Sequence, residues 1–161
     1  MSTLGQEMED NHDETMRSRI VRLAFRGDEH RFQTFIDALR RVTPKGGEVI
    51  LRGSAVTGSR WSDGQPFDAE GPGTSDLDVT FLAADLVGLW NAFYIPGLHT
   101  VPLSEEHPDA CPALNELREG LCDLAGRPVN LQASTSLVQF ARDVLFDQPY
   151  YTLIDSDRGG P

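Results

Sequence analysis

The segment Val49–Leu82 constrains the fold more than any other part of this chain. It begins with an apolar run that ends in Gly53-Ser54, and it closes with the run SDLDVTFL at 75–82. From Asp76 to Phe81 polar and apolar side chains alternate strictly, which is typical of a strand with one buried face. Between the two runs lie a short segment that Gly58 ends and a loop rich in Gly, Pro, Ser and Asp. The segment therefore predicts strand, turn, short helix, long loop and strand.

Two features of this segment suit a phosphorylated ligand. Asp76 and Asp78 are two residues apart on a strand, so their carboxylates point the same way and repel each other unless a cation lies between them. A strand that ends in Gly53-Ser54 and turns into a helix also offers backbone N–H groups to an anion. The simplest physical interpretation is a phosphate-binding turn beside a magnesium site.

The pattern Gly53-Ser54-x-x-x-Gly58, followed by Ser75-Asp76-x-Asp78, resembles the signature of nucleotidyltransferases of the DNA polymerase beta superfamily. It is most similar to the small, minimal members. The resemblance implies that the Gly-Ser pair holds a nucleoside triphosphate, with ATP as the first expectation, and that the two aspartates hold two Mg²⁺ ions. The residues assigned to nucleotide binding are Gly53, Ser54, Gly58, Ser59, Arg60 and Ser75.

The sequence departs from the family pattern at the third carboxylate, which the family supplies from a later strand. The expected strand is Val129–Ala133, and it places Asn130 where that acid is expected. On this strand Asn130 shares one face with Gln132, while the apolar side chains share the other. An amide oxygen is a weaker metal ligand than a carboxylate, and an amide is no useful base. The loop between the two halves of the motif is also longer than small members usually carry.

Three explanations of Asn130 remain open. Another group, such as Glu70, Asp68 or a metal-bound hydroxide, serves as the base. Alternatively, the domain binds a nucleotide without turning it over. In the third explanation the strand is misplaced, and the missing acid is Asp123 or Asp155.

The leading expectation is a Mg²⁺-dependent nucleotidyltransferase with Asp76, Asp78 and Asn130 at its catalytic centre. It would move a nucleoside monophosphate from a triphosphate to a hydroxyl group of a protein, an RNA or a small molecule. One alternative is a nucleotide-binding module of the same fold that is weakly active or inactive. Another is a partner-binding domain that binds no nucleotide.

The charge of the chain limits its partners. With 14 Lys and Arg against 25 Asp and Glu, the net charge is −11. General DNA binding is not expected, because non-specific binding depends on neutralising phosphates with Lys and Arg. Lys45 is the only lysine, so a phosphate contact would come from an arginine.

The cysteines and the hydropathy indicate the compartment. Cys111 and Cys122 are too few for a disulfide framework, and they have no zinc-site spacing. No apolar run in the sequence is long enough to span a bilayer, and the N-terminus has no signal-peptide pattern. The expected setting is therefore reducing and cytoplasmic, without membrane contact.

The spacing of apolar residues predicts one α/β (α+β) domain, in which helices pack around a small mixed sheet. Residues 1–14 are polar and acidic and are expected to be a disordered leader, so the domain covers 15–161. Phe67 is expected to pack in the core or to form a wall of a base pocket, and His99 and His107 are expected to be solvated. Helices are expected at 15–24, 28–42, 55–61, 86–93, 109–125 and 134–145, and strands at 48–52, 76–82, 98–103, 129–133 and 149–155.

Overall fold

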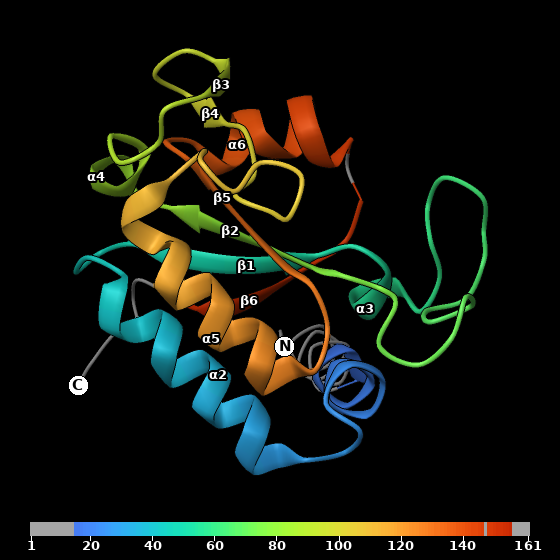
Figure 1. Cartoon of the computed structure of the whole chain (residues 1–161). Coiled ribbons are helices and arrows are strands. Elements are labelled where there is room, and N and C mark those ends of the chain that lie inside the picture. The colour runs from blue at the N-terminus through green and yellow to red at the C-terminus, as the bar shows by residue number, and fades with distance from the viewer. Residues whose placement is uncertain (1–14, 147, 156–161) are drawn as a thin grey trace, which may run out of the picture.

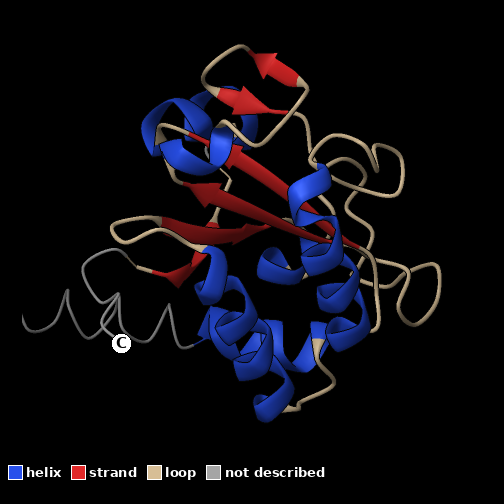
Figure 2. Ribbon diagram, turned by 60° about the vertical axis from the view of Figure 1, so that its left-hand side comes forward, coloured by secondary structure: helices blue, strands red, loops and turns tan. Residues whose placement is uncertain are grey.

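The structure is a computed structural model that describes residues 15–146 and 148–155 (Figures 1 and 2). The predicted leader, residues 1–14, lies outside the described residues. None of the described helices is long and apolar enough to cross a membrane.

A six-stranded mixed sheet with the order β3-β4-β5-β2-β1-β6 forms the centre of the fold. β1 is antiparallel to β2, and β2 is parallel to β5. The sheet and the helices around it confirm the predicted α/β class (Figure 1). The strands are β1 (Glu48–Arg52), β2 (Leu77–Leu82), β3 (Phe93–Ile95), β4 (His99–Thr100), β5 (Val129–Ser134) and β6 (Tyr150–Ile154).

Helices α2 (Glu29–Val42) and α5 (Asn115–Ala125) pack side by side on one face of the sheet (Figure 1). The Asp28 side chain accepts a hydrogen bond from the Arg31 N–H and caps α2, as its position in the sequence predicts. A helix that covers residues 15–24 joins this layer, which buries the main apolar core.

The other face of the sheet is covered in part by α6 (Leu137–Phe140) and by a π-helical turn, η2 (Ala141–Leu145). Alternation along β1 divides its side chains between the two cores, because successive residues of a strand point to opposite faces. Ile50 packs with Phe140 and Leu145 under η2, whereas the neighbours of Ile50 in β1 belong to the main core.

Three short helices complete the described chain, and two of them correct predictions. The helix expected at 55–61 covers only Ser54–Thr57. The helix expected at 86–93 is wrong, because α4 is a single turn and residue 93 begins β3. Trp90 is nevertheless buried. The spacing of apolar residues at 86–93 therefore indicated which residues are buried, but it did not indicate the correct secondary structure. The short helices are α3 (Ser54–Thr57), α4 (Ala84–Val87) and the 3₁₀ turn η1 (Pro112–Leu114).

His99 is not solvated as predicted, because its side chain is buried in β4. Its Nδ1 lies 2.8 Å from Ser134 Oγ, and its Nε2 lies 3.1 Å from Asp143 Oδ2 in η2. Both partners are distant in the sequence, so local spacing gave no sign of them. His107, in contrast, is exposed as expected.

Candidate functional site

Asn130 and the two aspartates of the motif meet on one face of the sheet. Asp78 in β2 pairs in register with Asn130 in β5, and Asp76 directly precedes β2. Asn130 Nδ2 donates to Asp76 Oδ2 at 2.8 Å and to Asp78 Oδ1 at 3.0 Å. The amide therefore lies beside both carboxylates, where the sequence led us to expect it.

The Asp78 carboxylate lies in an unfavourable electrostatic environment. Burial and the neighbouring charge of Asp76 raise the pKa of Asp78 above its ordinary value. The charge of Arg52 and the hydrogen bond from Asn130 act in the opposite direction but do not offset this. The carboxylate pair therefore favours the uptake of a positive charge, which a proton or a metal ion could supply.

Gly53 brings the backbone of the following turn close to this pair. Its φ of 97° lies in a region that favours glycine. A Cβ atom at this position would lie 3.3 Å from Asp78 Oδ2. Helix α3 begins at the next residue, Ser54, and the first turn of a helix leaves N–H groups without helical acceptors. Backbone donors and carboxylates therefore lie side by side.

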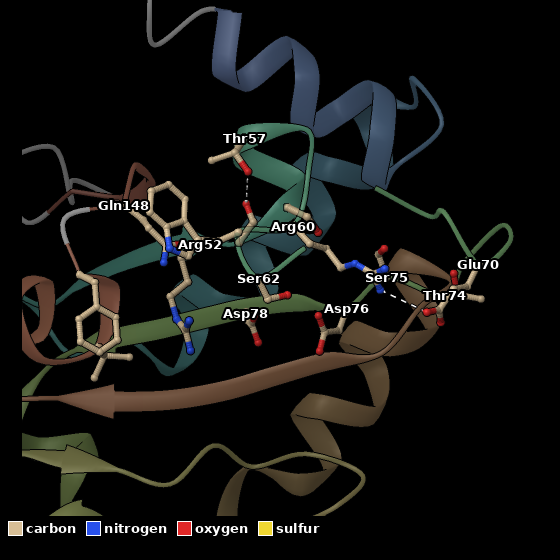
Figure 3. A pocket seen from close by; sticks show the side chains of 15 residues that line it. Arg52, Thr57, Arg60, Ser62, Glu70, Thr74, Ser75, Asp76, Asp78 and Gln148 are labelled. Atoms are coloured by element: carbon tan, nitrogen blue, oxygen red, sulfur yellow. Dashed lines mark hydrogen bonds and ion pairs between the residues drawn. The ribbon is translucent and has the colours of Figure 1, made fainter. Parts of the chain in front are cut away.

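A cavity of about 540 Å³ opens beside the turn and the carboxylates (Figure 3). Asp76, Asp78 and Arg52 all contribute to its wall. Arg52 Nη2 donates to Gln132 Oε1 at 3.4 Å, and Arg52 Nε is buried without a hydrogen-bond partner among the described residues. Arg60 also lines the cavity, where it pairs with Asp63 at 3.0 Å and with Glu70 at 3.3 Å.

The six residues predicted to bind a nucleotide do not all reach the cavity. Gly53, Ser54, Arg60 and Ser75 line it, whereas Gly58 and Ser59 are not part of its wall. Gly58 ends α3 with a φ of 88°, and its N–H donates to the Ser54 carbonyl, so in this structure it acts as a helix C-cap.

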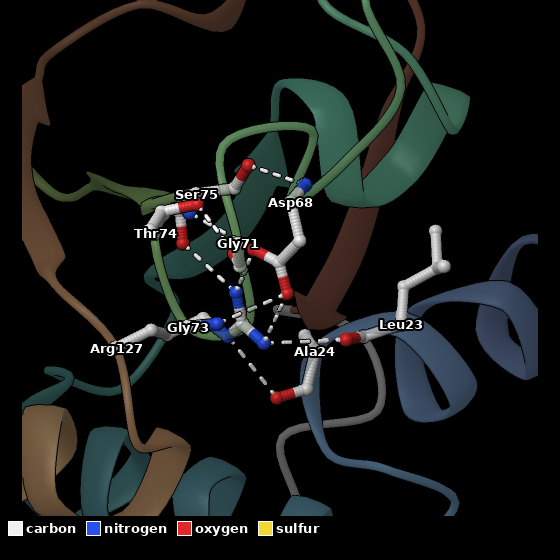
Figure 4. A network of polar contacts seen from close by, with 8 residues as sticks. All are labelled: Leu23, Ala24, Asp68, Gly71, Gly73, Thr74, Ser75 and Arg127. Carbon is white, nitrogen blue, oxygen red and sulfur yellow. Dashed lines mark hydrogen bonds and ion pairs between the residues drawn. The ribbon is translucent and has the colours of Figure 1, made fainter.

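A network around Arg127 holds the long loop that precedes Asp76 in the sequence, and Figure 4 shows its contacts with Asp68 and Ser75. Arg127 is 6% exposed, and its guanidinium donates to both Asp68 carboxylate oxygens, at 2.8 Å and 3.2 Å. It also donates to the Ser75 carbonyl at 3.0 Å and to the carbonyls of Leu23 and Ala24 at 3.3 Å each. The network therefore ties three distant segments together, and one of its members, Ser75, directly precedes Asp76 in the chain.

Asp68 and Phe67 are both part of this network. The Asp68 carboxylate also accepts hydrogen bonds from the N–H groups of Gly73 and Ser75. The Arg127 guanidinium lies 4.6 Å from the centre of the Phe67 ring, and Phe67 is buried. Asp68 is therefore a structural partner of Arg127. Phe67 packs in the core, which is the first of the two roles expected for it.

The other candidates for a third acid lie away from the pair. Asp123 is exposed on α5, which covers the opposite face of the sheet. Asp155 follows Ile154, which pairs with Val49 at the far end of β1 from Arg52. Among the described residues, no three His, Cys, Asp or Glu side chains gather as a metal site would need. The side chains that could hold a metal ion here are the two aspartates, together with the Asn130 amide oxygen.

A second cavity, of about 320 Å³, is lined by Asp76 but not by Asp78. It shares Thr74 and Asp76 with the first cavity, and Asn130 also lines it. Glu105 and Glu106 belong to its wall, so this cavity has an acidic lining, whereas the first cavity contains two arginines. Asp76 therefore lines both cavities, and only the first of them also has arginines in its wall.

Comparison with known proteins adds no relative, since no family model, no curated protein and no solved structure matches this chain. The site is thus characterised by its own geometry. The resemblance of its motif to the nucleotidyltransferases stays a prediction from the sequence.

Proposed function

We propose that this chain is a Mg²⁺-dependent nucleotidyltransferase that transfers a nucleoside monophosphate from a triphosphate to a hydroxyl group. The observation that carries the proposal is the carboxylate pair of Asp76 and Asp78, which lies against the Gly53 turn at the wall of a cavity. A negative pair and a backbone turn suit the two components of a metal–triphosphate complex.

The residues fit a divalent cation. The raised pKa of Asp78 follows from burial and from the charge of Asp76, and a cation between the carboxylates would relieve both effects. Asp76 and Asp78 would hold the metal, and Asn130 could contribute its amide oxygen after half a turn of its side chain. Bound Mg²⁺ would neutralise triphosphate charge and stabilise the attacking and leaving oxygens.

The triphosphate would lie along the turn and the arginines. Gly53 and Ser54 offer backbone N–H groups, and the Ser54 hydroxyl adds a further donor. Arg52 lines the cavity beside the turn and would contribute positive charge. Arg60 is held at the cavity by Asp63 and Glu70, and it would add positive charge. The volume of about 540 Å³ is within the usual range for small-molecule sites.

The second cavity offers a route for the acceptor. It shares Thr74 and Asp76 with the first cavity, so a hydroxyl group bound there would lie beside the Asp76 carboxylate. The acidic lining, with Glu105 and Glu106, disfavours a phosphate-rich acceptor such as RNA. A hydroxyl-bearing protein or small molecule suits this charge better.

A second candidate function, nucleotide binding without turnover, is favoured by Asn130. Asp68 is engaged by Arg127 and is unsuited to the role of a base. Glu70 lines the first cavity but pairs with Arg60. Turnover would therefore depend on Glu70 or on a metal-bound hydroxide.

The test is a pyrophosphate-release assay with each of the four ribonucleoside triphosphates, Mg²⁺ and candidate hydroxyl acceptors. We expect release with the parent protein and none with Asp78→Asn. Asp85→Asn is the matched control, because Asp85 is an exposed aspartate in α4 outside both cavities, and it should behave as the parent. Nucleotide binding without pyrophosphate release would favour a binding module that does not turn the nucleotide over. Pyrophosphate release by Asp78→Asn at the parental rate would contradict the proposal that Asp78 belongs to the active site of a nucleotidyltransferase.

A further inference from the structure

Two large aromatic side chains are exposed at the wall of the first cavity. Trp61 is 71% exposed and Phe146 is 67% exposed, and both line the cavity that contains Asp76 and Asp78. They lie 85 residues apart in the sequence. Exposed aromatic surface is unfavourable in water, so two such rings at one cavity point to a ligand that covers them.

The backbone holds both rings at this place. Trp61 lies in a closed turn, in which the Arg60 N–H donates to Gln65 and the Gly64 N–H donates back to Arg60. Phe146 ends the π-helical turn η2 with a φ of 51°, a conformation that bulky residues rarely adopt. Strained backbone and π-helical turns both occur frequently at functional sites. The local structure therefore presents these rings at the cavity and does not bury them.

The cavity combines these rings with charged groups. Arg52, Asp76 and Asp78 supply its charged part, and Trp61 and Phe146 supply flat apolar surface. Figure 3 shows Gln148, a further lining residue, near Arg52 and on the side away from Glu70 and Thr74. A nucleotide has the same division, with a charged phosphate chain and a flat, weakly polar base.

We infer that Trp61 and Phe146 form the base-binding part of the site and stack on the nucleobase of the bound triphosphate. This inference rests on the proposed function, since it assumes that the phosphates lie at the Gly53 turn. The rings that stack on the base thus differ from Phe67, which is buried beneath Arg127. Stacking on aromatic side chains tolerates every base, because each base has a π face.

The chain contains a spectroscopic probe for this contact. It has two tryptophans, and Trp90 is buried, with 4% exposure, whereas Trp61 is exposed. Titration of the parent with ATP and Mg²⁺ should therefore change the fluorescence of Trp61. Tripolyphosphate with Mg²⁺ is the matched probe without a base, and it should bind with little change in fluorescence.

Calorimetry on the variants supplies the second measurement. Trp61→Ala should weaken ATP binding about tenfold or more, and Phe146→Leu should weaken it less, because Leu keeps apolar bulk but not the flat ring. The affinity for tripolyphosphate should not change in either variant. Val138→Ala is the control, because Val138 is 77% exposed and lies outside the cavity wall, so its ATP affinity should equal that of the parent.

The two ways to fail are distinguishable. If ATP and tripolyphosphate bind the parent equally well and Trp61→Ala binds ATP as the parent does, the base site is refuted and the phosphate site stands. If the parent binds neither ligand, the proposed function fails, and the base site fails with it.

Discussion

Asp68 and Asp78 are two partly buried aspartates close to the same cavity, and they have opposite environments. Burial alone would raise the pKa of Asp68, but hydrogen bonds from Arg127 and from the N–H groups of Ser75 and Gly73 lower it overall. Burial also raises the pKa of Asp78, and there the adjacent charge of Asp76 adds to the effect. The negative charge of Asp68 is balanced by Arg127 and by N–H donors, whereas the negative charge of Asp78 has a like charge beside it.

The difference separates a structural group from a candidate functional one. Asp68 is satisfied within the protein, so it stabilises the loop and needs no ligand. Asp78 is left with a like charge beside it and an amide that only partly compensates, so its environment improves when a cation binds. Carboxylates with raised pKa values are found preferentially at functional sites. A carboxylate in a structural ion pair, such as Asp68, has its pKa lowered instead.

Removal of Arg127 should produce the largest effect. In Arg127→Met the Asp68 carboxylate loses its ion pair, and the carbonyls of Ser75, Leu23 and Ala24 lose a donor. Breaking a buried pair of this kind typically lowers the free energy of unfolding by about 3–5 kcal/mol, which urea denaturation would measure.

The matched control for this variant is Arg40→Met. Arg40 pairs with Asp37 on the exposed face of α2, with side chains 46% and 47% exposed, so its loss should change the free energy of unfolding by about 0–1 kcal/mol. Equal losses in the two variants would refute the idea that Arg127 and Asp68 form a structural pair.

The substitution Asn130→Asp should have the next largest effect. It removes two hydrogen bonds to Asp76 and Asp78 and adds a third negative charge, so without metal the free energy of unfolding should fall by about 2 kcal/mol. Mg²⁺ should recover this loss, because it would bind the folded state preferentially. Thermal melts with Mg²⁺ and with a chelator would measure both.

Asn91→Asp is the control for the metal effect. Asn91 donates one hydrogen bond to the Asp109 carbonyl in an exposed part of the chain, so its loss should lower stability without any response to Mg²⁺. If the melting temperature of Asn130→Asp also ignores Mg²⁺, Asn130 is not beside a metal site.

The smallest effect is a difference in pH dependence between Asp68→Asn and Asp78→Asn, measured without metal. The stabilising contribution of Asp68, whose pKa is lowered, is present above a pH of about 4 and is lost as the pH falls through that lowered pKa. The pKa of Asp78 is raised, so its contribution is present below a pH of about 4 and is lost as the pH rises through the raised value.

Unfolding free energies between pH 3 and pH 8 would therefore show opposite trends. As the pH falls, the free energy of unfolding of the parent should decrease toward that of Asp68→Asn. As the pH rises, the free energy of unfolding of Asp78→Asn should increase relative to that of the parent. Trends of the same sign in both variants would remove the contrast between the two carboxylates.

Local alternation predicted the central strands and the faces of Asp76, Asp78 and Asn130, whereas the resemblance to the nucleotidyltransferases implied that the three residues lie together. The pattern of β2 placed Asp76 and Asp78, and the pattern of β5 placed Asn130 on the face that the strand register then brings to Asp78. The pairing of β2 with β5 joins distant segments, and only the resemblance implied that Asn130 would lie beside the two aspartates.

The remaining features depend on contacts between distant segments. Arg127 meets Asp68 across 59 residues, and His99 meets Asp143 across 44 residues, so no local spacing indicates either pair. Trp61 and Phe146 show no periodicity with the core, and only the folded chain brings them to one cavity. An aromatic residue at the end of an apolar helix normally predicts packing, which is why their exposure could not be foreseen.

The central claim is that Asp78 belongs to a metal–nucleotide site, and calorimetric titration with Mg²⁺ and ATP tests it. The parent should bind ATP with Mg²⁺ and lose most of this binding when a chelator removes the metal. Asp78→Asn should remain folded and lose the Mg²⁺-dependent binding, whereas Asp85→Asn should keep it. If Asp78→Asn binds Mg²⁺ and ATP as tightly as the parent, the carboxylate pair is not a metal site, and the account is contradicted.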